Sequence, residues 1–259
     1  MPLSETPDPD AERPGHDPLG RPDSPRPGPD AEGPNADAFD ALARRALALV
    51  VPGRRAVLGI AGSPGAGKTS LAVQLAARVN ELSAASGGPG APFAMHLPMD
   101  GYHLAESTLR RLGRLDRKGA IDTFDGWGFV ALLQRILVER DHTVFTPSFD
   151  RRVEEPIAAE LAVEPETQLV IVEGNYLLVD DGPWAGITEL LTEAWFCETP
   201  DAVRVSRLVA RHELGGRSPE AALDWAESVD GRNALLIEST RPRADLVVSG
   251  ETARVVAGE

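Results

Sequence analysis

Gly62-Ser63-Pro64-Gly65-Ala66-Gly67-Lys68-Thr69 is the stretch that decides the fold of this chain, and it fits the pattern G-x-x-x-x-G-K-[ST] at every constrained position. An apolar run at 56–61 precedes it, and an Ala-rich segment with helical spacing follows at 68–82. In a strand, loop and helix of this kind, glycine amides and the helix N-terminus bind phosphate. The stretch, with Ser70 behind it, therefore predicts a triphosphate site in which Lys68 reaches the β- and γ-phosphates and Thr69 ligates Mg²⁺.

Strands and helices are expected to alternate along the rest of the chain. This alternation predicts an α/β fold, a three-layer sandwich with a mostly parallel central sheet, helices on both faces and a helical lid. Between the first helix and the next strand, 83–92 (SAASGGPGAP) predicts a flexible connector. The further candidate strands are 93–97, 143–146, 169–172, 194–197 and 244–248, and the further candidate helices are 38–51, 127–140, 201–214, 219–229 and 231–239.

Charge and composition exclude several classes of protein. The chain has 259 residues, and 26 Lys and Arg against 40 Asp and Glu leave a net charge of −14, which opposes nonspecific binding to nucleic acid or anionic lipid. The single cysteine, Cys197, excludes an intramolecular disulfide and a cysteine-rich zinc site. No apolar run reaches the roughly 18 residues of a membrane span. We expect a cytoplasmic protein whose partner is a small molecule, and leave the oligomeric state open, a homodimer included.

The N-terminal 37 residues differ from the rest of the chain. They hold 10 of the 22 prolines and no aromatic residue, so they cannot bury enough apolar surface to offset the entropy of ordering. We predict a disordered, acidic, Pro-rich tail at 1–37 and one domain at 38–259. The tail is either a solubilising extension or a docking segment, and the sequence does not decide between these.

Two carboxylates follow predicted strands. Asp100 comes just after the strand at 93–97, at the sheet edge where open parallel sheets bind ligands, so it is a candidate base for a substrate hydroxyl. The alternative is that Asp100 only caps the turn before Gly101. Glu173 ends the apolar run at 169–172 and is a candidate for the Mg²⁺ side of the site, or else a strand-end acid satisfied by a loop amide.

Arginines gather on the candidate helix at 201–214. Arg204, Arg207 and Arg211 have i, i+3, i+7 spacing and share one face, and Arg217 follows a Gly215-Gly216 pair. Guanidinium groups on a mobile lid can stabilise a transferring phosphoryl group, although a solvated basic face would have the same spacing. Neither lysine of the chain lies in an N-K-x-D segment, so the expected purine is adenine rather than guanine.

Together these residues resemble the P-loop kinase family of uridine kinase, phosphoribulokinase and bacterial pantothenate kinase. The likeness covers about 56–248. Within the family, the chain is similar above all to the bacterial nucleoside/nucleotide kinase-like branch, which includes kinases linked to fructose transport. The likeness also includes the segments Asp122-Thr123-Phe124-Asp125, Pro147-Ser148-Phe149-Asp150-Arg151 and Val172-Glu173-Gly174-Asn175-Tyr176.

The resemblance implies an ATP- and Mg²⁺-dependent kinase with a small hydroxyl-bearing acceptor: a nucleoside, a sugar or a pantothenate-like compound. It implies that Asp100 is the general base and that Glu173 and Thr69 hold the metal. It also implies that the lid arginines bind phosphate: Arg204 and Arg211 would act with Lys68 in catalysis, and Arg207 and Arg217 would bind the nucleotide. Uridine kinases have a histidine after the segment that matches Phe149-Asp150, and this chain has none there. The rival functions are a nucleotide-dependent switch and a plain ATPase. Candidate acceptor-pocket residues are Tyr102, His103, Asp125, Phe149, Asp150, Arg151 and Tyr176.

Overall fold

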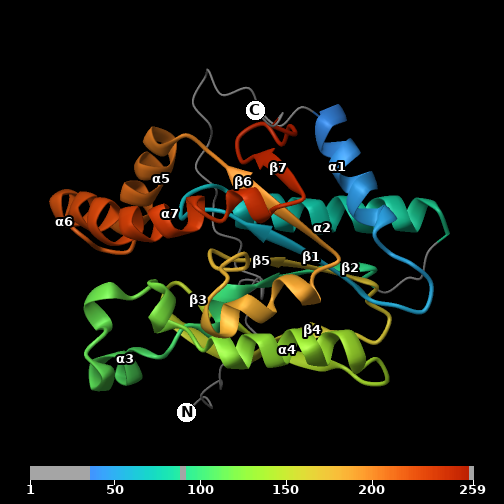
Figure 1. Cartoon of the computed structure of the whole chain (residues 1–259), viewed down its shortest axis with the longest axis horizontal. Helices are drawn as coiled ribbons and strands as arrows, with labels where there is room; N and C mark the ends of the chain where they lie inside the picture. The colour runs from blue at the N-terminus through green and yellow to red at the C-terminus, as the bar shows by residue number, and fades with distance from the viewer. Residues whose placement is uncertain (1–35, 88–91, 257–259) are drawn as a thin grey trace, which may run out of the picture. The chain divides into compact units, whose positions relative to one another are not determined.

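The computed structural model describes residues 36–87 and 92–256 of the chain (Figure 1). The predicted tail therefore lies outside the described residues except at its last two positions. There the first helix, α1 (Ala36–Ala48), has already begun. Four residues of the predicted connector, 88–91, also lie outside the described part, and helix α2 (Lys68–Ala85) occupies its beginning.

Five parallel strands form the central sheet, which confirms the predicted α/β architecture. Their order is β2-β5-β1-β6-β7, and every neighbouring pair is parallel. Glu173 at the end of β5 lies opposite Ile60 of β1 on one side and Pro98 of β2 on the other. The segments that follow these three strands therefore leave the sheet at one edge. The strands are β1 (Ala56–Ala61), β2 (Ala94–Pro98), β5 (Leu169–Glu173), β6 (Glu193–Glu198) and β7 (Leu246–Ser249).

Both faces of the sheet are buried. Leu58 and Ile60 of β1 point into a core shared with α1 and α2, whereas Val57 and Ala61 point into a second core shared with α4 (Figure 1). This period of two is what a strand between two helical layers produces. None of the described helices is both long and apolar enough to cross a bilayer. The remaining helices are α3 (Glu106–Leu112), α4 (Gly126–Val138), α5 (Asp201–Leu214), α6 (Pro219–Trp225) and α7 (Gly231–Glu238).

One predicted strand belongs to a different sheet. The segment predicted at 143–146 is part of β3 (Val144–Asp150), which pairs antiparallel with β4 (Glu155–Val163) in a separate two-stranded sheet. Sequence analysis missed β4 because much of it is exposed, so it shows no regular alternation of apolar residues. It missed α3 for a similar reason, since only Leu109 of that short helix is buried.

Arg55 joins the start of β1 to two other parts of the fold. Its side chain is almost completely buried and donates hydrogen bonds to backbone carbonyl oxygens: Nε to Thr167 at 2.8 Å, Nη1 to Ile136 at 2.6 Å and Nη2 to Glu164 at 2.8 Å. The guanidinium thus adds hydrogen bonds to the end of α4 and to the turn before β5.

Replacing Arg55 by Met should destabilise the protein by about 3 kcal/mol or more, because the carbonyl oxygens of Ile136 and Thr167 would lose their hydrogen-bond donor in a buried position. Denaturant unfolding measures this change. The matched control is Arg54→Met at the exposed neighbouring position, for which we expect a change of about 0.5 kcal/mol or less. Equal losses in the two variants would contradict the role given to Arg55.

Candidate active site

The loop between β1 and α2 has the backbone that phosphate binding requires. Gly65 has φ +79, and a Cβ atom there would lie 2.7 Å from the carbonyl oxygen of Arg204, so only glycine fits. Gly67, the N-cap residue of α2, has φ +97 and no side chain to cap the helix. The first amides of α2 therefore stay open to an external anion.

Donors on β6 and α5 hold this loop from behind. Ala66 O accepts hydrogen bonds from Thr199 Oγ1 at 2.8 Å and Cys197 Sγ at 3.3 Å, and Pro64 O accepts one from Arg204 Nη1 at 3.1 Å. In a trans peptide the N–H points opposite to the C=O. Fixing these two carbonyl oxygens therefore turns the N–H groups of the following residues, Gly65 and Gly67, to the other side of the loop.

Lys68 and Ser63 make contacts around the loop itself. Lys68 Nζ donates to Ser63 O at 3.0 Å, and the side chain is 7% exposed. Burial lowers the pKa of Lys68, while the charges of Glu173 and Asp100 act in the opposite direction. Ser63 Oγ donates to Glu238 Oε1 of α7 at 2.5 Å, a contact that links the loop to the last helix.

Two oxygen ligands lie beside each other at the sheet edge. Thr69 Oγ1, in the first turn of α2, donates to Glu173 Oε1 at 2.9 Å. His96 of β2 also approaches this carboxylate, with Nε2 3.6 Å from Oε1 and no hydrogen-bond partner among the described residues. Sequence analysis paired Thr69 with Glu173 but missed His96, whose only signal was a polar residue inside a short apolar strand.

Asp100 lies just beyond β2, in a short 3₁₀ turn at Met99–Tyr102. Its Oδ2 is 3.4 Å from Arg151 Nη2, and its backbone oxygen is 2.8 Å from His103 Nδ1. Burial by itself would raise the pKa of this carboxyl, but nearby basic side chains outweigh burial and hold the pKa below its usual value. In order of effect they are His103, Arg151, Lys68 and Arg211.

The predicted arginine face divides into two groups. Arg204 is buried and, with Arg207, donates to carbonyl oxygens of the loop, so neither side chain is free in the open cleft. Arg217 stacks on Trp225 of α6, with its guanidinium carbon 3.9 Å from the ring centroid. Arg211 is exposed, and its side chain makes no hydrogen bond or ion pair with any described residue, yet its charge acts on Asp100. Of the four predicted lid arginines, Arg211 is thus the one whose side chain has no partner among the described residues.

The candidate acceptor residues are only partly brought together. His103 lies between the rings of Phe124 and Phe149, with centroids 4.0 and 4.7 Å away, and Arg151 approaches Asp100 on the same side. Tyr102 packs edge-on against Phe129.

The other three candidates have structural contacts instead. Asp125 caps α4 by accepting from Gly128 N, and Asp150 pairs with Arg152. Tyr176 is fully buried, and its hydroxyl donates to the carbonyl oxygen of Gly119. Burial raises the pKa of Tyr176, which keeps the phenol protonated. Each of these three side chains thus has a partner of its own within the protein.

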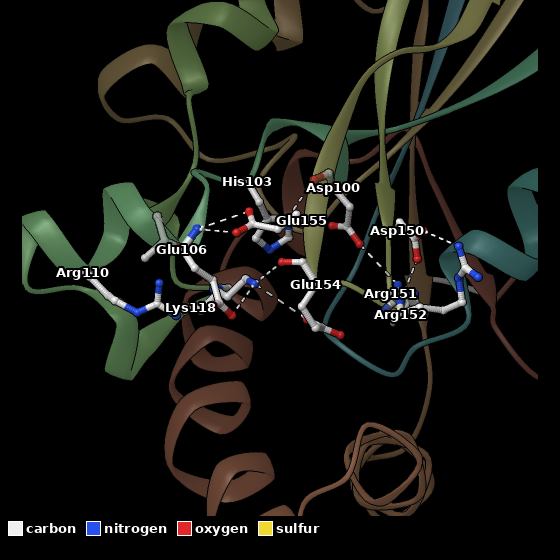
Figure 2. A network of polar contacts seen from close by, with 12 residues as sticks. Asp100, His103, Glu106, Arg110, Lys118, Asp150, Arg151, Arg152, Glu154 and Glu155 are labelled. Atoms are coloured by element: carbon white, nitrogen blue, oxygen red, sulfur yellow. Dashed lines mark hydrogen bonds and ion pairs between the residues drawn. The ribbon is translucent and has the colours of Figure 1, made fainter.

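A polar network beside Asp100 was missed in the sequence (Figure 2). Lys118 Nζ donates to the backbone oxygen of Glu154, pairs with Glu106 Oε1 at 3.3 Å and lies 5.4 Å from the ring centroid of Phe149. The carboxylate of Glu155 accepts from the backbone N–H of Glu106. The signal available in the sequence was that Lys118 is one of only two lysines in a chain that otherwise uses arginine.

Comparisons with known proteins identify relatives of this chain. A scan against protein-family models finds no match. The Schizosaccharomyces pombe protein named "Putative uridine kinase C227.14" is 29% identical over 223 residues, which cover 84% of this chain and 92% of the relative. The Escherichia coli protein YggC, whose name assigns no function, is 33% identical over 206 residues, which cover 78% of this chain and 81% of YggC.

A solved structure extends the likeness to three dimensions. It is the "putative fructose transport system kinase" of Silicibacter sp. TM1040, with a TM-score of 0.72, 36% identity and coverage of 81% of this chain and 98% of that one. Because this identity extends over nearly the whole of that protein, the likeness is more than a shared fold. The chain belongs to the uridine kinase-like family of P-loop, ATP-dependent kinases.

Proposed function

We propose that this phosphotransferase moves the γ-phosphoryl group of ATP to a hydroxyl group of a small metabolite. The observation that carries the proposal is the position of Asp100 at the same sheet edge as the phosphate loop. Its Oδ2 faces Arg151, and no described residue makes a hydrogen bond or ion pair with Oδ1. Oδ1 is therefore available to an incoming hydroxyl group.

In the proposed reaction, Asp100 accepts the proton of the acceptor hydroxyl as that oxygen forms a bond to the γ-phosphorus. The bond from the γ-phosphorus to the β–γ bridging oxygen breaks, and ADP leaves. Because basic neighbours hold the pKa of Asp100 below its usual value, the carboxyl is ionised at neutral pH and can take the proton. The loop amides and Lys68 bind the β- and γ-phosphates, and Arg211 offsets charge on the transferring group.

A magnesium ion fits the same edge. Mg²⁺ takes oxygen ligands and usually keeps few protein ligands, with substrate phosphates supplying others. Thr69 Oγ1 and Glu173 Oε1, 2.9 Å apart, are such a pair of oxygens and would hold it. When bound, Mg²⁺ would neutralise charge on the β- and γ-phosphates. The orphaned Nε2 of His96 lies 3.6 Å from the same oxygen of Glu173 and would orient this carboxylate.

The acceptor is proposed to be a nucleoside, a sugar or a pantothenate-like compound. His103 and Phe149 provide ring surfaces beside Asp100, and Arg151 provides donors. The names of the relatives, uridine kinase and fructose transport system kinase, support a polyhydroxyl acceptor.

We place this activity in the cytoplasm, with neither nucleic acid nor a membrane as partner, because the net charge of −14 opposes binding to both.

Asp100→Asn should lower acceptor-dependent ADP formation by about 10²–10⁴-fold, because the amide cannot take the hydroxyl proton. Binding of MgATP, measured by titration calorimetry, should be retained. Asp141→Asn, on the exposed loop before β3, is the control and should leave turnover unchanged. A screen of nucleosides, sugars and pantothenate identifies the acceptor for this assay. If ADP release by the wild type depends on none of these acceptors, the result would favour a plain ATPase. Unchanged turnover in Asp100→Asn would remove Asp100 from the mechanism.

Glu173→Gln should raise the Mg²⁺ concentration needed for half-maximal activity about 10–100-fold, because a charged ligand partner is lost. The measurement is an Mg²⁺ titration at fixed ATP. Glu193→Gln, an acid at the start of β6, which lies two strands away from β5, should leave the Mg²⁺ requirement as it is. An identical shift in both variants would show a change in net charge rather than the loss of a ligand.

Arg151→Gln should move the acidic limb of the kcat/KM profile to higher pH. Arg151 is among the groups that hold the pKa of Asp100 down, so its removal raises that pKa and protonates the base earlier as the pH falls. The profile is measured with the acceptor found in the screen. A limb that stays in place or moves to lower pH would contradict the role of Arg151 beside the base.

A further inference from the structure

We propose that the acceptor carries an anionic group, a carboxylate or a phosphate, near its reacting hydroxyl, and that Arg151 binds this group. The inference rests on the proposed kinase function and names the acceptor class more narrowly. It concerns the space between the β3–β4 turn and Asp100 (Figure 2). Three observations support it: the charge balance of this space, the separation of Arg151 from the lid, and the way in which the turn is held.

The acids around this space, apart from Asp100, have partners of their own. Each is bound either to a basic side chain of the same network or to a backbone N–H group, so none needs Arg151 (Figure 2). The pairs are Glu106 with Arg110 and Lys118, Asp150 with Arg152, Glu154 with Lys118, and Glu155 with the backbone N–H of Glu106.

Arg151 has only a weak ion pair among the described residues. Its ion pair with Asp100 is long, at 3.4 Å, and 53% of its side-chain surface is exposed. The side chain of Arg211 makes no hydrogen bond or ion pair with any described residue. The charges of Asp230, Asp100 and Glu154 act on it, and so does the like charge of Arg151. The two guanidinium groups therefore lie close enough to repel each other. A further negative charge between them would be favourable, and guanidinium groups bind carboxylate and phosphate in a two-pronged fashion.

The two arginines come from different parts of the fold. Arg211 lies on α5 with the residues that hold the phosphate loop, so the γ-phosphate of ATP accounts for its charge and for that of Lys68. Arg151 lies on the turn between β3 and β4, beside the rings of Phe149 and His103. The nucleotide therefore leaves Arg151 without a full counter-charge, and the remaining group that can approach it is the acceptor.

The turn that carries Arg151 is held in place by Lys118. Glu154 has φ +55, a left-handed conformation that is unfavourable for glutamate. Lys118, with 12% of its side chain exposed, donates to the backbone oxygen of this residue and to Glu106. These contacts fix the turn before any acceptor arrives. A pre-positioned arginine loses less entropy on binding, which is what an anion-binding group requires.

The experiment compares acceptors that differ only in charge. Glycerol, D-glycerate and sn-glycerol 3-phosphate form one set, pantothenol and pantothenate a second, and fructose and fructose 1-phosphate a third. ADP formation is followed with wild-type protein, Arg151→Gln, Arg151→Lys and Arg152→Gln. Arg152 is the matched control because it lies on the same turn, is 89% exposed and pairs with Asp150.

Within at least one set, the wild type should use the anionic acceptor with a kcat/KM at least tenfold above that of the neutral one. Arg151→Gln should lower the value for the anionic acceptor at least tenfold more than the value for the neutral one, which removes the preference. Arg151→Lys should restore part of it, and Arg152→Gln should behave as wild type. D-glycerate against sn-glycerol 3-phosphate separates a carboxylate from a phosphate as the anionic group.

Neutral acceptors that are used as well as, or better than, their anionic counterparts overturn this inference while leaving the kinase function intact. An equal loss for charged and neutral acceptors in Arg151→Gln also overturns it, since Arg151 would then act only through Asp100. If no acceptor of either kind stimulates ADP formation, the proposed function fails and this inference fails with it. An unchanged KM for MgATP and an unchanged Tm show that Arg151→Gln is folded.

Discussion

The whole site depends on the hydrogen bonds that fix the carbonyl oxygens of the phosphate loop, the loop between β1 and α2, on the side that faces β6 and α5. Thr199 and Cys197 at the end of β6 bind one of these oxygens, and Arg204 of α5 binds another. Without them the loop peptides could rotate, and their amides would not converge on phosphate. Arg204 is buried because it binds the loop from inside the protein. Burial also raises the pKa of the Cys197 thiol to about 12, so the thiol stays protonated and can donate its hydrogen bond.

A parallel sheet brings the remaining groups to this loop. Because β1, β2 and β5 run in the same direction, the loop, Asp100 and Glu173 leave the sheet at one edge, although they are far apart in sequence. The charge there is the reverse of the chain as a whole. A protein with a net charge of −14 places Lys68, Arg211 and other basic groups near Asp100, so this edge of the sheet can attract phosphate.

Side-chain roles were harder to predict than the positions of the central strands. Helical spacing correctly placed Arg204, Arg207 and Arg211 on α5, but spacing does not tell which side of a helix faces the loop and which the cleft. Tyr176 is adjacent in sequence to strand-end residues, yet its ring is in the core because the chain turns inward after β5. The antiparallel hairpin β3–β4 was missed as a pair because its second strand is largely exposed.

The sequence by itself determined the phosphate loop, the alternation of strands and helices, and the two strand-end acids, because these depend on local patterns of glycine, apolar residues and their spacing. Only the tertiary structure decided which groups around Asp100 contact one another. His103 and Arg151 were candidates from the sequence, but their contacts were not predicted, and Lys118 was not predicted at all. These side chains meet because the β3–β4 turn folds over the sheet edge. Contacts between distant segments follow from packing and charge pairing in three dimensions, which no local pattern records.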